Sequence, residues 1–150
     1  MDQDQQRFVR MALDEARKAE AAGDEPFGCV IVLNGEVVAR GRNQINTTRD
    51  ATAHSETMAV RAATATLGRR ELSDCVLYTN WEPCQMCAAT ILEMKVGAII
   101  MGGREGFPGD YRIEKMLDAA ATWGARLNLV TGVLQKECAE VVMSWWKRTS

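Results

Sequence analysis

Two short segments of this chain carry residue types that bind transition metals, and each stands where a helix is expected to begin. Cys84 and Cys87 are three residues apart and follow Pro83, whose fixed φ suits the first turn of a helix. His54 is the only histidine of the chain and comes two residues before Glu56, at the start of a second helical pattern. A fold that uses these three ligands together brings the N-termini of two helices to one point.

Hydrophobic periodicity places these two helices in an alternation of strands and helices. Asn34-Gly35 separates two strand-like runs and predicts a hairpin, because both turn residues must accept positive φ. Loops are expected at 43–52 and 102–110. The predicted elements are, in order, a helix 3–21, strands 27–33 and 36–40, a helix 54–67, a strand 75–79, a helix 83–94, a strand 96–101, a helix 112–123, a strand 127–130 and a helix 135–147.

This order predicts a three-layer α/β fold, with a mixed five-stranded sheet between helices on both faces. The helix between the last two strands makes their connection a crossover, so these two strands should be parallel. The length of 150 residues suits one core, and no repeat or linker divides it, so residues 1–150 are expected to form one domain.

Composition narrows the class of protein. No stretch approaches the roughly 20 apolar residues of a membrane span. The N-terminus is polar, unlike a secretory signal, and the five cysteines show no disulfide spacing, which predicts a reduced, cytoplasmic protein. The net charge of −2 is unfavourable for a broadly basic nucleic-acid-binding surface, although it leaves room for a local basic groove.

The ligand types predict a catalytic zinc site. One histidine nitrogen and two thiolates leave the fourth zinc position for water, as in catalytic sites. Helix N-termini favour the thiolate over the thiol. Glu56, near the metal but not on it, can move a proton from water to a leaving amine. We therefore expect one Zn²⁺ per chain on His54, Cys84 and Cys87, with Glu56 as the catalytic acid–base.

Each half of the pattern has other interpretations when it stands alone. A Cys-x-x-Cys pair can be a redox pair or buried packing, but a redox role leaves the His-x-Glu unexplained. A closed structural site would need a fourth ligand from Cys29, Cys75 or Cys138. The first two fall inside apolar strands and the third on a late helix, so all three are expected to be core thiols.

Three further segments complete the pattern of a known family. Pro26-Phe27-Gly28 precedes the first strand, Gly41-Arg42-Asn43 ends the second, and residues 79–87 read Thr-Asn-Trp-Glu-Pro-Cys-Gln-Met-Cys. With the His-x-Glu, these segments resemble the zinc deaminases of the cytidine deaminase-like superfamily over nearly the whole chain. The branch of tRNA adenosine, bacterial guanine and fungal cytosine deaminases is the most similar. Ser55 stands where alanine or glycine is usual.

The resemblance implies hydrolytic deamination, in which a ring carbon exchanges its amine for a carbonyl and releases ammonia. It supports the metal ligands and the acid–base named above. It also implies that Asn43 hydrogen-bonds the heterocycle, that Phe27 forms a wall against it and that the Ser55 amide faces it. The alternative interpretations are structural: Phe27 packs in the core of the strand, and Asn43 serves as a turn residue at the end of the strand. Trp81 is expected beside the metal, lining the pocket or a subunit contact.

Residues after the fourth predicted strand bear on the substrate. tRNA adenosine deaminases usually carry an Asp-x-Lys-Thr-Gly-Ala-type segment there, which this chain lacks. Gly106-Phe107 followed by Asp110 is more similar to the Gly-Phe-Asp-Asp segment of guanine deaminases. Asp110 is then expected to contact the base, or alternatively to cap the following helix. The C-terminal residues 136–148, with Trp145 and Trp146, instead resemble the tail of a tRNA deaminase.

The acidic charge balance favours a small substrate. We therefore expect a zinc-dependent deaminase of a free nucleobase or related amino-heterocycle, similar to guanine, cytosine or a triazine. The resemblance implies a homodimer. The alternative is a tRNA-specific adenosine deaminase that forms inosine. A non-enzymatic zinc module that binds nucleic acid would need a closed metal site or a basic stripe, and the sequence shows neither.

Overall fold

A five-stranded sheet forms the middle layer of the computed structural model, which describes residues 2–104, 113–122 and 124–150. The strands lie in the order β2-β1-β3-β4-β5. β1 is antiparallel to both of its neighbours, whereas β3, β4 and β5 are parallel. The mixed sheet with parallel last strands is therefore confirmed. The strands are β1 (Gly28–Leu33), β2 (Glu36–Arg42), β3 (Cys75–Trp81), β4 (Ala98–Gly103) and β5 (Asn128–Val130).

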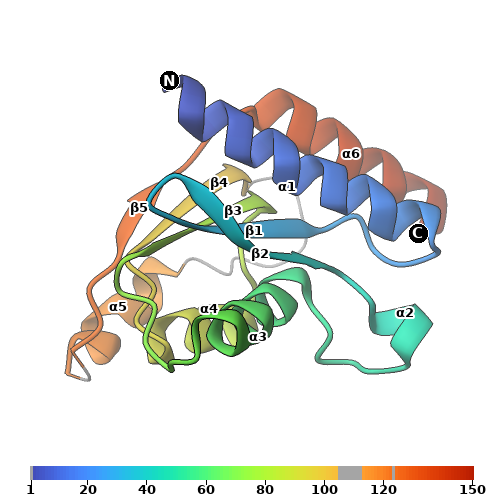
Figure 1. Ribbon diagram of the computed structural model, residues 1–150. Helices are drawn as coiled ribbons and strands as arrows, with labels where there is room; N and C mark the ends of the chain where they lie inside the picture. Colours follow the sequence, from blue (N-terminus) through green and yellow to red (C-terminus); the bar gives the residue numbers. More distant parts are fainter. Residues whose placement is uncertain (1, 105–112, 123) are drawn as a thin grey trace.

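Helices cover both faces of this sheet, which confirms the predicted three-layer architecture. Figure 1 shows α1 and α6 side by side on one face and α3, α4 and α5 on the other. No helix of the described residues is long and apolar enough to cross a membrane. The helices are α1 (Gln3–Ala21), α2 (Ile45–Thr48), α3 (Ser55–Leu67), α4 (Gln85–Glu93), α5 (Glu114–Ala121) and α6 (Gln135–Thr149).

The strands are buried on alternating sides, so the sheet separates two hydrophobic clusters. Cys29 and Ile31 face the cluster under α3 and α4, and Val30 and Val32 face the cluster under α1 and α6. The hairpin is confirmed as well, since Asn34 and Gly35 have φ of 51° and 80°. These positive values are those that the turn requires.

The predicted loop 43–52 contains a short helix, α2, that the sequence did not indicate. The side chain of Gln44, its N-cap, makes no capping hydrogen bond. Instead, the buried carboxylate of Asp24 accepts from the backbone N–H groups of Asn46 at 2.8 Å and Thr47 at 3.0 Å, and from the Thr47 hydroxyl at 2.8 Å. The cap comes from a residue distant in sequence, which explains why local patterns missed the helix.

Helix starts differ from the predictions by one or two residues. Pro83 precedes α4 instead of opening it, because Cys84 is the N-cap and the helix begins at Gln85. His54 is likewise the N-cap of α3. Positions 112 and 123 of the predicted helix 112–123 lie outside the described residues. Within the described part of this range, the helix is α5.

A glycine permits the close approach that positions α3. A Cβ atom on Gly41 would lie 2.2 Å from the backbone oxygen of Ser55 and 2.6 Å from the backbone nitrogen of Ala59. Both atoms belong to the helix backbone, which cannot give way as a flexible side chain can. Strand β2 therefore contacts the first turns of α3 directly, and this contact fixes where the helix begins.

We predict that Gly41→Ala destabilises the fold by about 1–3 kcal/mol, because overpacking forces the backbone of α3 away from β2. Thermal unfolding of both proteins measures the effect. Glu36→Ala, at an exposed position of the same strand, is the control and should leave the melting temperature unchanged. Equal stability of Gly41→Ala and the parent protein would contradict this account of the strand–helix contact.

Candidate metal centre and active site

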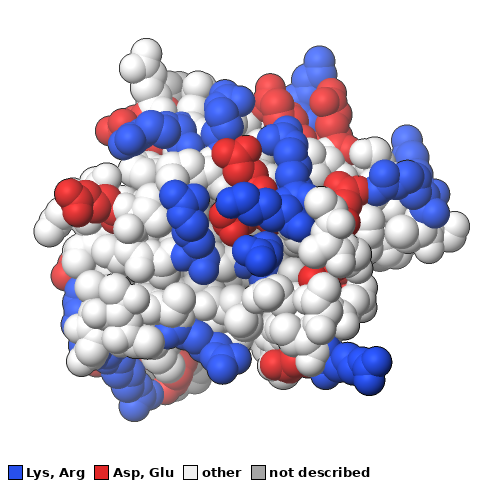
Figure 2. Space-filling model, turned by 45° about the vertical axis from the view of Figure 1, so that its right-hand side comes forward, with Lys and Arg blue, Asp and Glu red and all other residues white. Residues whose placement is uncertain are grey.

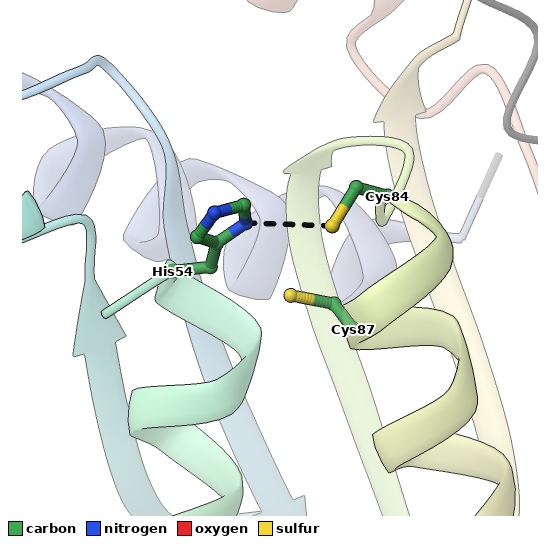
Figure 3. A group of neighbouring side chains, drawn as sticks. All are labelled: His54, Cys84 and Cys87. Atoms are coloured by element: carbon green, nitrogen blue, oxygen red, sulfur yellow. Dashed lines mark hydrogen bonds between the residues drawn. The ribbon is translucent and has the colours of Figure 1, made fainter. Parts of the chain in front are cut away.

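The three predicted metal ligands lie together at the N-termini of α3 and α4. Figure 3 shows His54 at the start of α3 facing Cys84 and Cys87 at the start of α4. One ligand atom of each residue lies within 4.8 Å of the others, and Cys84 Sγ is 3.4 Å from His54 Nδ1. The sequence prediction that two helix starts converge on one point is therefore borne out in the geometry.

These positions fit tetrahedral zinc. With Zn–S of about 2.3 Å and Zn–N of about 2.0–2.1 Å, a tetrahedral site separates the sulfur and the nitrogen by about 3.6 Å. The observed 3.4 Å between Cys84 Sγ and His54 Nδ1 is close to this value. The N,S,S donor set suits zinc, and three ligands leave one position open. The described residues contain no other cluster of at least three His, Cys, Asp or Glu side chains that could hold a metal.

Both N-cap residues leave their helices without a side-chain cap. Neither His54 nor Cys84 makes the capping hydrogen bond that Ser, Thr, Asp or Asn usually provides at this position. Their side chains are turned toward the metal position instead. The hydrogen bond from Cys87, together with His54, lowers the pKa of Cys84, which favours its thiolate. The Thr57 hydroxyl lies 3.4 Å from Cys87 Sγ, where it can donate to a thiolate.

The other three cysteines lie away from this cluster, as expected for core thiols. Cys29, Cys75 and Cys138 are free and buried. Burial raises the pKa of each of them, and that of Cys138 reaches about 12. Their sulfur atoms do not belong to the group of ligand atoms of His54, Cys84 and Cys87, so they do not supply a fourth ligand, which argues against a closed structural site.

Glu56 is buried beside the metal cluster without belonging to it. Its Oε1 accepts hydrogen bonds from the Ser55 hydroxyl at 2.9 Å and the Thr79 hydroxyl at 3.0 Å. Burial raises the pKa of Glu56, while the Ser55 hydrogen bond opposes the shift. A carboxyl group with a raised pKa and a fixed orientation is suited to exchanging protons near neutral pH. Ser55, the irregular residue of the motif, thus contacts the proposed acid–base directly.

A cavity of about 170 Å³ opens beside the metal cluster. This volume is below the roughly 300–1,000 Å³ of pockets that hold drug-sized ligands, so it suits a single base. All four residues predicted around the substrate, apart from Asp110, line it. The lining residues are Glu25, Phe27, Asn43, His54, Ser55, Glu56, Trp81, Glu82 and Cys84.

Asn43 is held with its amide group available to the cavity. Its Oδ1 accepts from the backbone N–H of Ile45 at 3.1 Å and of Glu25 at 3.5 Å. Its backbone N–H donates to the backbone oxygen of Phe27 at 3.0 Å. No hydrogen bond of the described residues uses Nδ2, which leaves two N–H donors for a ligand. Ser55, the first residue of α3, presents a backbone N–H that has no partner within the helix.

Phe27 and Trp81 form apolar walls of the cavity, and each depends on a neighbour. The Phe27 ring packs edge-on against Trp145 of α6, with centroids 6.1 Å apart. Trp145 does not line the cavity itself, and Trp146 contacts Trp145 at 6.2 Å. The Trp81 ring lies so close to Gly103 that a Cβ there would be 2.2 Å from it. Asp110 lies outside the described residues.

Asn80 holds the segment before β1 in place and was not predicted. It is fully buried, its Oδ1 accepts from the Gly28 N–H at 2.8 Å, and its Nδ2 donates to the Pro26 oxygen at 3.0 Å. These two bonds fix the backbone on both sides of Phe27. The position of Asn80 between Thr79 and Trp81, in the motif before the cysteines, is the signal that would have indicated it.

Two acidic residues of the cavity were also missed. Glu82 is buried and forms an ion pair with Arg104, which in turn binds Glu114 of α5 at 2.6 Å. Glu25 is half-buried at the entry to β1. Glu82 belongs to the Glu-Pro-Cys run and could have been found from it. Glu25 lies next to Pro26-Phe27-Gly28, but its type carries no local signal of a pocket.

Comparisons with known proteins agree with this geometry. Residues 2–103 match the profile of the cytidine and deoxycytidylate deaminase zinc-binding region. The tRNA-specific adenosine deaminase of Bacillus subtilis (strain 168) is 31% identical over 93% of this chain and 87% of its own length. The guanine deaminase of the same organism is 45% identical, but over 56% of this chain and 54% of its own length.

A solved structure from a study of A-to-I editing by tRNA:A34 deaminases at the wobble position is also similar. It superimposes with a TM-score of 0.82 and is 33% identical. The match covers 90% of this chain and 98% of that chain. The similarity therefore extends from the metal segments to nearly the whole of both proteins.

We predict that the purified protein holds one zinc ion per chain and that Cys84→Ala or His54→Ala loses it. Two remaining ligands bind zinc far more weakly than three. Zinc content by atomic spectroscopy, after dialysis against a mild chelator, gives the result. Cys138→Ala is the matched control, because it removes a buried thiol outside the cluster. Loss of zinc from this control, or its retention by Cys84→Ala, would show that the ligand assignment is wrong.

Proposed function

The chain belongs to the cytidine and deoxycytidylate deaminase zinc-binding family, and from this premise we propose that it converts adenosine in tRNA to inosine. Membership makes it a zinc-dependent hydrolytic deaminase. The observation that carries the proposal of a tRNA substrate is the similarity to tRNA deaminases over 93% and 90% of this chain. The sequence had favoured a free base from residues 103–111 and the acidic charge, and had kept tRNA adenosine as the alternative.

The reaction replaces the 6-amino group of the adenine ring with a carbonyl: water adds and ammonia leaves. Zinc, when bound to His54, Cys84 and Cys87, supplies a water molecule whose pKa is lowered to about 7. Glu56 takes a proton from the attacking water and delivers it to the ring nitrogen. It then takes the remaining proton from the hydroxyl group formed on the ring carbon and passes it to the departing amine, so that ammonia leaves and a carbonyl remains. Its hydrogen bonds to Ser55 and Thr79 hold the carboxylate in one orientation through these transfers.

The cavity suits one flat base. Phe27 and Trp81 provide apolar surface, and the amide of Asn43 and the backbone N–H of Ser55 provide donors for ring nitrogens. A volume of about 170 Å³ excludes the neighbouring nucleotides. A target adenosine within RNA must therefore leave the stack and enter alone, as in other enzymes that modify single bases.

The surface allows contact with a phosphate backbone in spite of the net charge. Figure 2 shows basic side chains gathered on one face, with acidic side chains between them. Lys18, Arg40 and Arg42 surround the buried carboxylate of Glu15 at 3.2, 3.8 and 3.6 Å. Three cations share one buried anion, which leaves a local excess of positive charge that can attract phosphate groups.

A free aminated purine is the second candidate substrate. The observation that favours it is the identity of 45% to the guanine deaminase over 85 residues, which is higher than the identity to the tRNA deaminases. This similarity covers little more than half of the chain, whereas the similarity to the tRNA enzymes includes the C-terminal part as well. For this reason the free purine is placed second.

We predict that the zinc-loaded protein forms inosine in an anticodon stem-loop with adenosine at the wobble position. Free adenine, guanine and cytosine should release little or no ammonia under the same conditions. The control is the same stem-loop with guanosine at that position. If guanine is deaminated efficiently and the stem-loop is inert, the free-purine candidate replaces the tRNA proposal.

A second prediction separates Glu56 from the metal ligands. Glu56→Gln should keep zinc and the fold, because the amide has the size of the carboxyl group, but turnover should fall by roughly 10²- to 10⁴-fold, the usual contribution of an acid–base group. Glu36→Gln, exposed on β2, should retain both zinc and activity. Loss of zinc in Glu56→Gln would make this residue a ligand, and near-normal turnover would make it a bystander.

A further inference from the structure

Three carboxylates line the cavity, and two of them are already engaged. Glu56 accepts hydrogen bonds from Ser55 and Thr79, and Glu82 is paired with Arg104. The carboxylate of Glu25 forms no hydrogen bond or ion pair with any described residue, although it is half-buried. It is the one pocket carboxylate whose partner is left to a ligand.

Hydrogen bonds hold the backbone at Glu25, which places the residue on the cavity wall. The preceding residue, Asp24, is buried and accepts hydrogen bonds from Asn46 and Thr47 of α2. The Glu25 N–H donates to Asn43 Oδ1 at 3.5 Å, and its carbonyl oxygen accepts from the Phe27 N–H at 2.8 Å. These contacts join residues 24–27 to residues 43–47, the two segments that border the cavity.

The hydrogen bond between Glu25 and Asn43 also sets two recognition groups next to each other. Asn43 offers N–H donors, while the Glu25 carboxylate offers only acceptors. A partly buried carboxylate without a donor is unfavourable, because it has lost water and gained no hydrogen bond. A ligand that fits this wall presents an acceptor to Asn43 and a donor to Glu25.

We propose that Glu25 is a specificity-determining residue, which accepts a hydrogen bond from an N–H or O–H group of the substrate beside the reacting ring. The inference rests on the proposed deaminase function only in taking the ligand to be an aminated base or nucleoside. Within a nucleoside, the adenine base carries ring-nitrogen acceptors and, apart from its reacting amine, no N–H donor. In a tRNA substrate the donor is therefore the ribose 2′-hydroxyl. All free purines share a ring N–H, so there a residue that determines specificity reads a second amino group.

Two substrate pairs, each differing by one donor, distinguish these sources. The first pair is the anticodon stem-loop with adenosine or 2′-deoxyadenosine at the wobble position. The second pair is 2,6-diaminopurine and adenine, which differ by the 2-amino group. For each, kcat/KM is measured for ammonia release, and the dissociation constant is measured by calorimetry, with the zinc-loaded protein and its Glu25→Ala, Glu25→Gln and Glu36→Ala variants.

We expect the parent protein to prefer the donor-bearing member of one pair. Glu25→Ala should lower kcat/KM and affinity for that member by roughly 10- to 100-fold, the range for a lost hydrogen bond to a charged group, and leave the other member unchanged. Glu25→Gln keeps a neutral acceptor and should lie between. Glu36→Ala should match the parent, and unchanged zinc content and melting temperature show that each variant is folded.

If the ratio within both pairs is the same in Glu25→Ala as in the parent, for turnover and for binding, the proposal is overturned. A response of the stem-loop pair assigns the donor to the ribose, and a response of the purine pair assigns it to the base. A stem-loop that is inert with the parent protein contradicts the tRNA proposal alone, since the purine pair still reports on Glu25.

Discussion

The N-termini of α3 and α4 converge, and each helix presents a metal ligand at the position that usually holds its capping residue. His54 and Cys84 give up the side-chain cap, which typically stabilises a helix by about 1 kcal/mol. In return, the dipoles and free N–H groups of both helices point toward the same small volume. Such an environment stabilises thiolates and the negative charge that develops on the oxygen of the attacking water. The metal ligands are therefore in place only when the starts of both helices are in place, and the rest of the fold positions these two starts.

The sheet fixes the meeting point from two sides. Gly41 lets β2 lie against the first turns of α3, and Gly103 makes room for the Trp81 ring at the end of β3. Thr79 is buried in β3 and donates to Glu56, so the strand also orients the proposed acid–base. Asn80 ties the entry of β1 to the same strand. A shift of β3 would thus move the metal ligands, Glu56 and the cavity wall together.

The metal centre was predictable because its signal is local. Two ligand pairs at helix starts, with the proline before Cys84, carry their meaning within a few residues, and the alternation of apolar runs was enough to give the layers and the parallel strands. What the sequence missed depends on long-range contacts. Asp24 caps a helix more than 20 residues away, and Arg104 binds Glu82 across the end of the sheet. Glu25 lines the pocket only because the segment around residues 24–27 meets the segment around residues 43–47. The sequence used net charge as an argument against tRNA as the substrate, but net charge averages over a surface on which cations gather locally.

Hydrolysis at this centre requires an open zinc site with one nitrogen and two sulfur ligands from the protein. X-ray absorption at the zinc edge of the loaded protein tests it most directly. We expect two sulfur atoms at about 2.3 Å and two nitrogen or oxygen atoms at about 2.0–2.1 Å, one of them exchangeable for an added anion. Three or four sulfur atoms around the metal, with no exchangeable position, would contradict it, because a closed site has no place for the attacking water.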